Sequence, residues 1–297
     1  MGMKIAIGGK GGVGKTTVCC VWAQLFAAEG HGVPNATSGV GGPHDVLAID
    51  ADPSLSLGAA FGLPAQRTPK PLIEMKDLIA ERTGTRKDML GAYFRLNPAV
   101  SDLPEEHWLE VDRVKLLVLG AVTRAGGGCA CPEGAFLKAL LSHTILQRDE
   151  LVLVDLAAGV EFLGRASVQG IDAFVLVVEP GSRSLETATH IAGMAKDLGI
   201  GAVGAVANKV TDPAQLDVIC SRLEGIPLLG SVTYSRSIQE ADLQRTPVMQ
   251  ADAAAVRELD EARHHLIELM TRLAICRSIE ESEWSQINVA AIKPPRK

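Results

Sequence analysis

A glycine-rich segment near the start of the chain has the composition and spacing of a phosphate-binding loop. Residues 9–16 fit the pattern G-x-x-x-x-G-K-[ST], with Lys15 and Thr16 at the end. In such a loop, glycine N–H groups wrap a polyphosphate, Lys15 reaches the β- and γ-oxygens, and Thr16 holds Mg²⁺. A turn that merely joined a strand to a helix would not need this lysine and threonine. The predicted nucleotide contacts are Gly11, Gly12, Val13, Gly14, Lys15, Thr16 and Thr17.

Carboxylates follow two apolar runs further along the chain. Asp50 and Asp52 come after the run at 46–49, and Asp155 comes after the run at 151–154. Open α/β folds bind their ligands beyond the carboxyl ends of the strands, so these side chains are candidates for chemistry at a phosphate. An aspartate before Pro53 is also a common way to begin a turn. The position of Asp52 after the second strand of a chain with a phosphate-binding loop favours the chemical role.

The elements that would position these residues alternate between strand and helix. Val18, Val21, Trp22, Leu25 and Phe26 have helical spacing after the loop, which would therefore lead into a helix N-terminus that favours anions. We predict an α/β fold of the P-loop NTPase type, with a mostly parallel central sheet and helices on both faces. Predicted strands lie at 5–7, 46–49, 115–119, 151–154, 174–178 and 203–207, and further helices at 72–82, 135–143, 185–198, 214–223 and 256–273.

The predicted domain organisation is a single P-loop ATPase domain over residues 1–275. The segment near 34–44 is longer than the usual connection in an α/β unit and is predicted to be an exposed, mobile loop. A cysteine-containing loop lies near 126–133, and residues 276–297 are predicted to be an irregular tail.

Composition narrows the classes of function. The 297 residues are 47% hydrophobic and 22% charged, which is ordinary for a globular protein. A net charge of −6 without a basic cluster argues against nucleic-acid binding. No apolar run is long enough to span a bilayer, and no basic amphipathic helix suggests stable membrane association. We therefore expect a cytoplasmic protein, in which the six cysteines favour metal or redox chemistry over disulfides.

The segment K-G-G-x-G-K-T-T, which begins at Lys10, resembles the deviant Walker A branch of P-loop ATPases. This branch includes the nitrogenase iron protein, the MinD and ParA families, and metal-insertion accessory ATPases. The resemblance implies that Lys10 reaches the phosphates of the other subunit, and hence a working homodimer. It also implies that Asp52 orients the attacking water, with Asp50 in support. Asp155 would hold the Mg²⁺ shell, Gly159 would sense the γ-phosphate, and Asn208 with Lys209 would read adenine.

Cys129 and Cys131 are one residue apart and together could bind one soft metal ion. Two thiolates fill half of a four-coordinate shell, and the dimer implied by Lys10 would bring a second pair to the two-fold axis. A tetrahedral site of four thiolates suits Zn²⁺, and a square-planar one suits Ni²⁺. Incidental thiols in a glycine-rich loop are the alternative.

Four segments extend the resemblance to the nickel-insertion accessory ATPases of carbon monoxide dehydrogenase and acetyl-CoA synthase, the CooC and AcsF type. They are 71–77, 96–98, 127–133 and 155–161, and the resemblance covers roughly 3–249. It implies a homodimer that uses ATP and Mg²⁺, carries Ni²⁺ or Zn²⁺, and matures a nickel-enzyme client. Ser56, which stands where relatives often have asparagine, departs from the family pattern, as do the 34–44 loop and the tail.

Three other functions compete with nickel insertion. One is a nucleotide-switched metal-binding dimer, which would not need a water-orienting carboxylate such as Asp52. A second is a redox dimer like the nitrogenase iron protein, whose cluster cysteines come from two separate segments rather than one adjacent pair. The third is a MinD- or ParA-like positioning ATPase. The sequence leaves open which nickel enzyme would be the client.

Overall fold

The computed structural model describes residues 2–29, 46–85, 94–120, 131–147, 150–157 and 170–291, with side chains on the last helix described as far as 276. Within this part of the chain, eight strands form one sheet in the order β3-β4-β2-β5-β1-β6-β7-β8. Every neighbouring pair is parallel except β3 with β4. The strands are β1 Lys4–Gly8, β2 Val46–Ala51, β3 Leu109–Val111, β4 Val114–Val118, β5 Leu151–Leu156, β6 Ala173–Val178, β7 Ala202–Val210 and β8 Leu228–Thr233.

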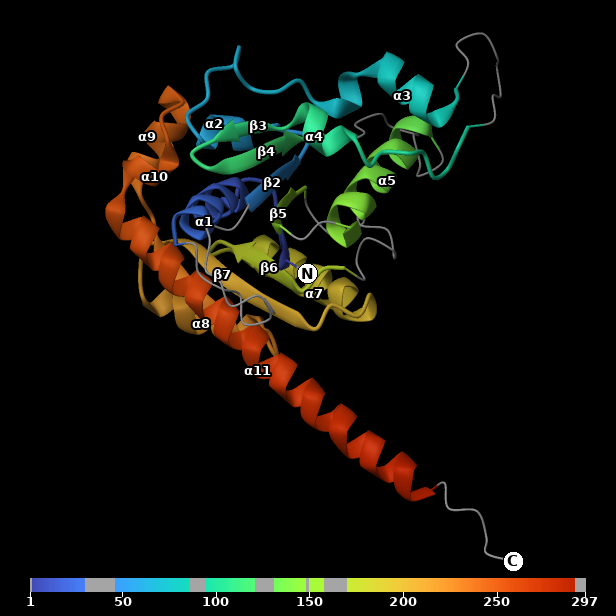
Figure 1. Ribbon diagram of the computed structural model, residues 1–297. Coiled ribbons are helices and arrows are strands. Elements are labelled where there is room, and N and C mark those ends of the chain that lie inside the picture. The colour runs from blue at the N-terminus through green and yellow to red at the C-terminus, as the bar shows by residue number, and fades with distance from the viewer. Residues whose placement is uncertain are drawn as a thin grey trace, which may run out of the picture.

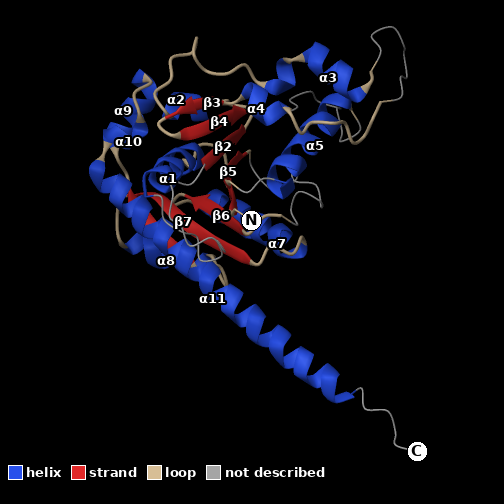
Figure 2. Cartoon of the chain, viewed as in Figure 1, coloured by secondary structure: helices blue, strands red, loops and turns tan. Residues whose placement is uncertain are grey.

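Helices cover both faces of the sheet, as Figures 1 and 2 show. Side chains alternate between the faces of a strand, so Ile5 and Ile7 of β1 pack with α1 and α11, while Ala6 belongs to the core on the opposite face with α5 and α7. The predicted fold class is therefore confirmed. The helices are α1 Lys15–Glu29, α2 Leu57–Ala60, α3 Lys76–Thr83, α4 Leu103–His107, α5 Pro132–Gln147, α7 Ser182–Asp197, α8 Ala214–Arg222, α9 Arg236–Gln244, α10 Val248–Ala251 and α11 Ala253–Ala291.

The central strands read as continuous apolar runs because both of their faces are buried. In β2, β5 and β6 every residue is buried. The register pairs Asp50 of β2 with Asp155 of β5, and pairs Ile7 of β1 with the same Asp155. Two acidic strand ends therefore lie side by side, next to the strand that leads into the glycine-rich loop.

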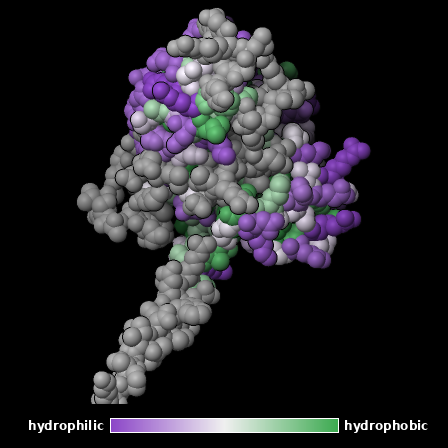
Figure 3. All heavy atoms as spheres, turned by 90° about the vertical axis from the view of Figure 1, so that its right-hand side faces the viewer, coloured by the Kyte–Doolittle hydropathy of each residue, from purple (hydrophilic) through white to green (hydrophobic). Residues whose placement is uncertain are grey.

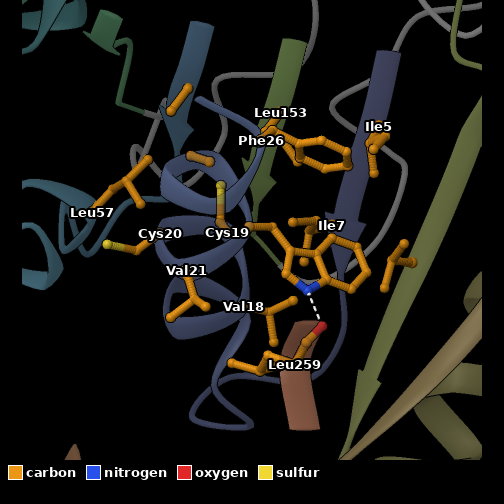
Figure 4. Close-up of a cluster of buried hydrophobic side chains, with 14 of the residues drawn as sticks. Ile5, Ile7, Val18, Cys19, Cys20, Val21, Phe26, Leu57, Leu153 and Leu259 are labelled. Atoms are coloured by element: carbon orange, nitrogen blue, oxygen red, sulfur yellow. Dashed lines mark hydrogen bonds between the residues drawn. The ribbon is translucent and has the colours of Figure 1, made fainter. Parts of the chain in front are cut away.

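Helix α1 is fastened to α11 inside one of the two cores. The indole of Trp22 is fully buried, and its Nε1–H donates to the backbone oxygen of Leu259 at 2.8 Å, the dashed line in Figure 4. Around this bond pack apolar side chains from α1, β1 and α11, among them Ile7, Val18 and Phe26. The element that follows the glycine-rich loop is thus held rigidly against the sheet.

The last helix differs from the prediction of an irregular tail from residue 276. Helix α11 continues to Ala291 and projects beyond the rest of the molecule in Figure 1. Residues 253–291 contain neither glycine nor proline, and the first proline after them is Pro294, so nothing in this sequence breaks the helix earlier. The predicted helix at 72–82 differs too, since it begins as a 3₁₀ turn at Leu72–Glu74 before α3.

Several sequence predictions fall outside the described residues: the mobile loop near 34–44, and residues 126–130 of the cysteine loop. Among the helices described, none is long and apolar enough to cross a membrane. On the side of α3, α5 and α7, the described surface is largely hydrophilic with smaller hydrophobic areas (Figure 3). These helices therefore turn their apolar side chains mainly toward the sheet.

Candidate active site

The glycine-rich loop connects β1 to α1, and its glycines meet strict steric demands. The backbone φ is +144° at Gly9 and +101° at Gly14, a region that other residues rarely adopt. A Cβ at Gly9 would lie 2.3 Å from the carbonyl oxygen of Val177, and one at Gly14 would lie 2.1 Å from the Asn208 amide nitrogen. The loop is therefore pressed against the ends of β6 and β7, and only glycine fits at these two positions.

Lys15 occupies the first position of α1 and is buried. Its Nζ lies 3.6 Å from Asp52 Oδ2, and it donates to the backbone oxygen of Lys10 at 3.4 Å. The Asp52 carboxylate also accepts the backbone N–H of Ser54 at 2.8 Å. The structure thus brings the predicted phosphate cation and the predicted water-orienting carboxylate into contact.

Thr16 lies against the second acidic strand end. Its hydroxyl donates to Asp155 Oδ2 at 2.7 Å and lies 3.3 Å from the Ser56 hydroxyl. The other oxygen of Asp155, Oδ1, is buried without a hydrogen-bond partner among the described residues. Burial, with a smaller contribution from the charge of Asp50, raises the pKa of Asp155 to about 8. The buried carboxyl oxygens of Asp155 and the hydroxyl of Thr16 form an oxygen-rich set that fits Mg²⁺.

Asp50 organises the segment that carries Asp52. It is fully buried, and its carboxylate accepts the backbone N–H of Asp52 at 3.2 Å and that of Leu57 at 3.0 Å. Burial raises the pKa of Asp50 to about 6, an effect that these two hydrogen bonds oppose. Asp50 therefore shapes the turn after β2, while its support of the chemistry at Asp52 stays a prediction.

Asn208 and Lys209 lie at the end of β7 and contact the glycine-rich loop. The Asn208 amide nitrogen donates to the Val13 carbonyl at 2.8 Å, and its Oδ1 accepts the Lys209 backbone N–H at 2.9 Å. The Lys209 Nζ donates to the Gly12 carbonyl at 2.5 Å. The structure thus shows both residues bracing the loop, while their reading of adenine stays a prediction.

Part of this site lines a cavity of about 550 Å³, which Asn208 and Lys209 also border. The loop and the segment after β2 form one wall, with Lys15, Thr16, Thr17 and Asp52. Sequence reasoning missed the opposite wall, which comes from the end of β8 and from α9. Within it the Tyr234 hydroxyl donates to Gln239 Oε1 at 2.9 Å. Its residues are Thr233, Tyr234, Ser235, Ile238, Gln239 and Asp242. Their position after a strand of the sheet is a sequence signal that could have identified them.

Of the predicted cysteine pair, only Cys131 lies among the residues that the structure describes. Cys131 directly precedes α5, and its thiol sulfur accepts the backbone N–H of Gly134 at 3.2 Å. The side chain is partly exposed and does not line the cavity. Cys129 and Gly159 lie outside the described residues, so their predicted roles stay predictions.

Comparison with known proteins identifies relatives of the whole chain. No model of a known protein family matches. The chain is 43% identical to the carbon monoxide dehydrogenase accessory protein CooC of Rhodospirillum rubrum, over 81% of this chain and 87% of the relative. It is 35% identical to an uncharacterised ATP-binding protein of Methanocaldococcus jannaschii, over 90% of this chain and 98% of the relative.

A solved structure, that of the septum site-determining protein MinD from Pyrococcus horikoshii in complex with Mg-ADP, has the same fold. It covers 92% of this chain and 98% of its own with a TM-score of 0.60, at 18% identity. The loop and this fold define a P-loop protein of the deviant Walker A class. Within that class, the chain belongs to the family of the CooC accessory proteins, since 43% identity extends over most of both sequences.

Proposed function

We propose that this protein is an ATP-dependent maturation factor that helps to insert nickel into a carbon monoxide dehydrogenase. The observation that carries the proposal is the convergence of Lys15, Thr16, Asp52 and Asp155 at the glycine-rich loop of a chain 43% identical to CooC. A binding protein without turnover would not need Asp52 beside the phosphate-binding lysine.

ATP and Mg²⁺ would occupy the cavity beside the loop. The loop N–H groups and Lys15 would hold the phosphates, and α1 begins at this point, so its N-terminus adds to the attraction for anions. Thr16 and Asp155 would hold Mg²⁺, which would offset the negative charge of the phosphates. Asn208 and Lys209 would contact the base, and Tyr234 and Gln239 line the opposite wall within the same cavity.

Asp52 would orient the attacking water for hydrolysis. Asp52 contacts Lys15, and a γ-phosphate would draw the lysine toward itself because the phosphate carries the larger negative charge. Asp52 would then be free to accept a hydrogen bond from water. Lys10 would complete the site of the facing subunit, so that hydrolysis requires a homodimer.

Nickel is the cargo in this proposal. Cys129 and Cys131 of two subunits would bind one Ni²⁺, or Zn²⁺ in the same position, through four sulfurs. The contact of the Cys131 sulfur with the Gly134 N–H supports this role, because it places a hydrogen-bond donor on a partly exposed sulfur at the start of α5. The relative's name favours carbon monoxide dehydrogenase as the client over acetyl-CoA synthase.

Activation of a purified, nickel-free carbon monoxide dehydrogenase tests the proposal. The protein with Ni²⁺ and Mg²⁺-ATP should restore client activity, and a non-hydrolysable ATP analogue should not. Lys15→Ala is the control, since it removes the phosphate cation and leaves both cysteines in place. Equal activation without ATP, or by the Lys15→Ala protein, would rule out an ATP-driven role.

A further inference from the structure

The carboxylate of Glu179 lies between two lysines of the candidate active site. Glu179 directly follows β6, and its Oε1 is 3.5 Å from Lys10 Nζ while its Oε2 is 3.4 Å from Lys209 Nζ. Lys209 in turn donates to the Gly12 carbonyl. One carboxylate therefore links the glycine-rich loop to the end of β7. Among the described residues, Glu179 is the acidic side chain that pairs with Lys10.

The backbone holds this arrangement in place. The N–H of Glu179 donates at 3.1 Å to the hydroxyl of Ser184, which is buried in the first turn of α7. Lys209 has a φ of +59°, a conformation that residues other than glycine seldom adopt. The ladder between β7 and β8 is irregular between Ala207 and Val210. The sheet thus directs both side chains toward the loop.

Lys10 rests beside the cavity of its own chain rather than within it. Its side chain is 40% exposed, and it is not among the residues that line the cavity, although Gly11 and Gly12 are. Its charge is paired with Glu179 of the same subunit. We propose that Glu179 is a positioning residue, which keeps Lys10 on its own subunit until nucleotide in the facing subunit draws the lysine across. This inference rests on the cross-subunit role of Lys10 in the proposed function.

The shared carboxylate makes the release of Lys10 easy. Lys10 and Lys209 are both positively charged and pair with the same carboxylate, so they repel each other. This repulsion weakens the ion pair that each lysine forms with Glu179. When Lys10 leaves, Glu179 keeps Lys209 as its partner and is not left unpaired. The pair is partly exposed, and such ion pairs are weak. A nucleotide with several phosphate charges can therefore compete for the lysine, and Glu179 sets how much nucleotide this takes.

Dimer formation with a non-hydrolysable ATP analogue, measured by sedimentation, tests the inference. Glu179→Gln should tighten the dimer about two- to fivefold, because Lys10 then starts unpaired and exposed ion pairs are worth about this factor. Glu179→Asp keeps the charge and should restore the parental value. Glu186→Gln removes an equal charge from an exposed position on α7 and should change nothing.

The same measurement in a Lys10→Ala background separates this inference from the proposed function. If Glu179 acts through Lys10, Glu179→Gln should have no effect on dimerisation in that background. A shift of equal size there, or an unchanged or weaker dimer in the single variant, overturns the positioning role. A Lys10→Ala protein that dimerises like the parent would instead overturn the cross-subunit role itself, whatever Glu179 does.

Discussion

At the scale of single residues, three aspartates meet beside the phosphate-binding loop. Asp50, Asp52 and Asp155 lie close together, and among the described residues Lys15 is the lysine that pairs with Asp52. Among the described residues, the buried Oδ1 of Asp155 has no hydrogen-bond partner and Thr16 donates to the other oxygen, so these two residues fit Mg²⁺. Nucleotide brings further negative charge, so Mg²⁺ and nucleotide should bind together.

Asp52→Asn is expected to separate binding from turnover. Phosphate contacts come from the loop and Lys15, so affinity for Mg²⁺-ATP should stay within a fewfold of the parent. Hydrolysis should fall about 10²-fold or more, the usual effect of removing a positioned acid–base group. Ser54→Ala is the matched control, since it leaves the carboxylate and its backbone contact with the Ser54 N–H in place. Parental ATPase rates in Asp52→Asn would show that another group orients the water.

The stability of the nucleotide-free protein should fall as the pH rises from 6 to 8. The pKa of Asp155 is raised by burial to about 8, so in this window the folded protein keeps a proton that the unfolded chain has lost. The free energy of unfolding then decreases, by up to about 1.4 kcal/mol per pH unit for one such group. Asp50 contributes in the same direction below pH 6, where its own pKa lies.

Thermal melts of the parent and of Asp155→Asn across this range provide the check. The variant should lose the part of the slope between pH 6 and 8 that Asp155 causes. Parallel curves would mean that Asp155 ionises normally in the folded chain.

The loop motif and the acidic strand ends were predictable because local sequence determines them. Parallel strands bring their carboxyl ends to one edge, so the meeting of Thr16, Asp52 and Asp155 followed from the order of motifs. The contacts of Glu179 and the wall containing Tyr234 and Gln239 were not predictable. They depend on which strands neighbour β1 and on the register between them, which no short pattern records.

At the scale of elements, α1 connects the phosphate-binding loop to α11. Trp22→Phe should lower the free energy of unfolding by about 2 kcal/mol, because it removes the buried bond to Leu259 and leaves unfilled space. Denaturant unfolding gives the measurement. Tyr234→Phe is a matched control that also removes one hydrogen bond, but its side chain is 46% exposed, so a change within about 0.5 kcal/mol is expected. Equal losses of unfolding free energy in both variants would mean that the contact between Trp22 and α11 contributes little to stability.

Long, fully buried strands were the elements easiest to predict. β6 is apolar throughout and β2 and β5 each begin with four apolar residues, whereas β8 mixes buried, half-buried and exposed positions and β3 has three residues, none of them fully buried. Their sequences resemble loops, and they become strands by pairing with β7 and β4. The last helix was predicted to end at residue 273, where the regular apolar spacing weakens. The helix propensity of the sequence does not weaken there, so α11 is longer than predicted.

At the scale of the whole molecule, the proposed dimer would join an ATP site and a metal site. The candidate ATP site lies at the ends of β1, β2 and β5, and Cys131, the described member of the cysteine pair, directly precedes α5, which leads into β5 and Asp155. A change at Asp155 on nucleotide binding could therefore reach the cysteines through α5. Linkage requires that nucleotide change the affinity for metal by the same factor as metal changes the affinity for nucleotide.

Titration of Ni²⁺ into the purified protein, with and without a non-hydrolysable ATP analogue, tests the proposed coupling of the two sites. We expect one Ni²⁺ per dimer, an affinity that differs between the two states by about tenfold, equal to about 1.4 kcal/mol, and a rise in affinity with pH as the thiols lose protons. Cys131→Ser should abolish this binding and spare that of ATP. One Ni²⁺ per monomer, or the same affinity with and without nucleotide, would contradict the proposed coupling.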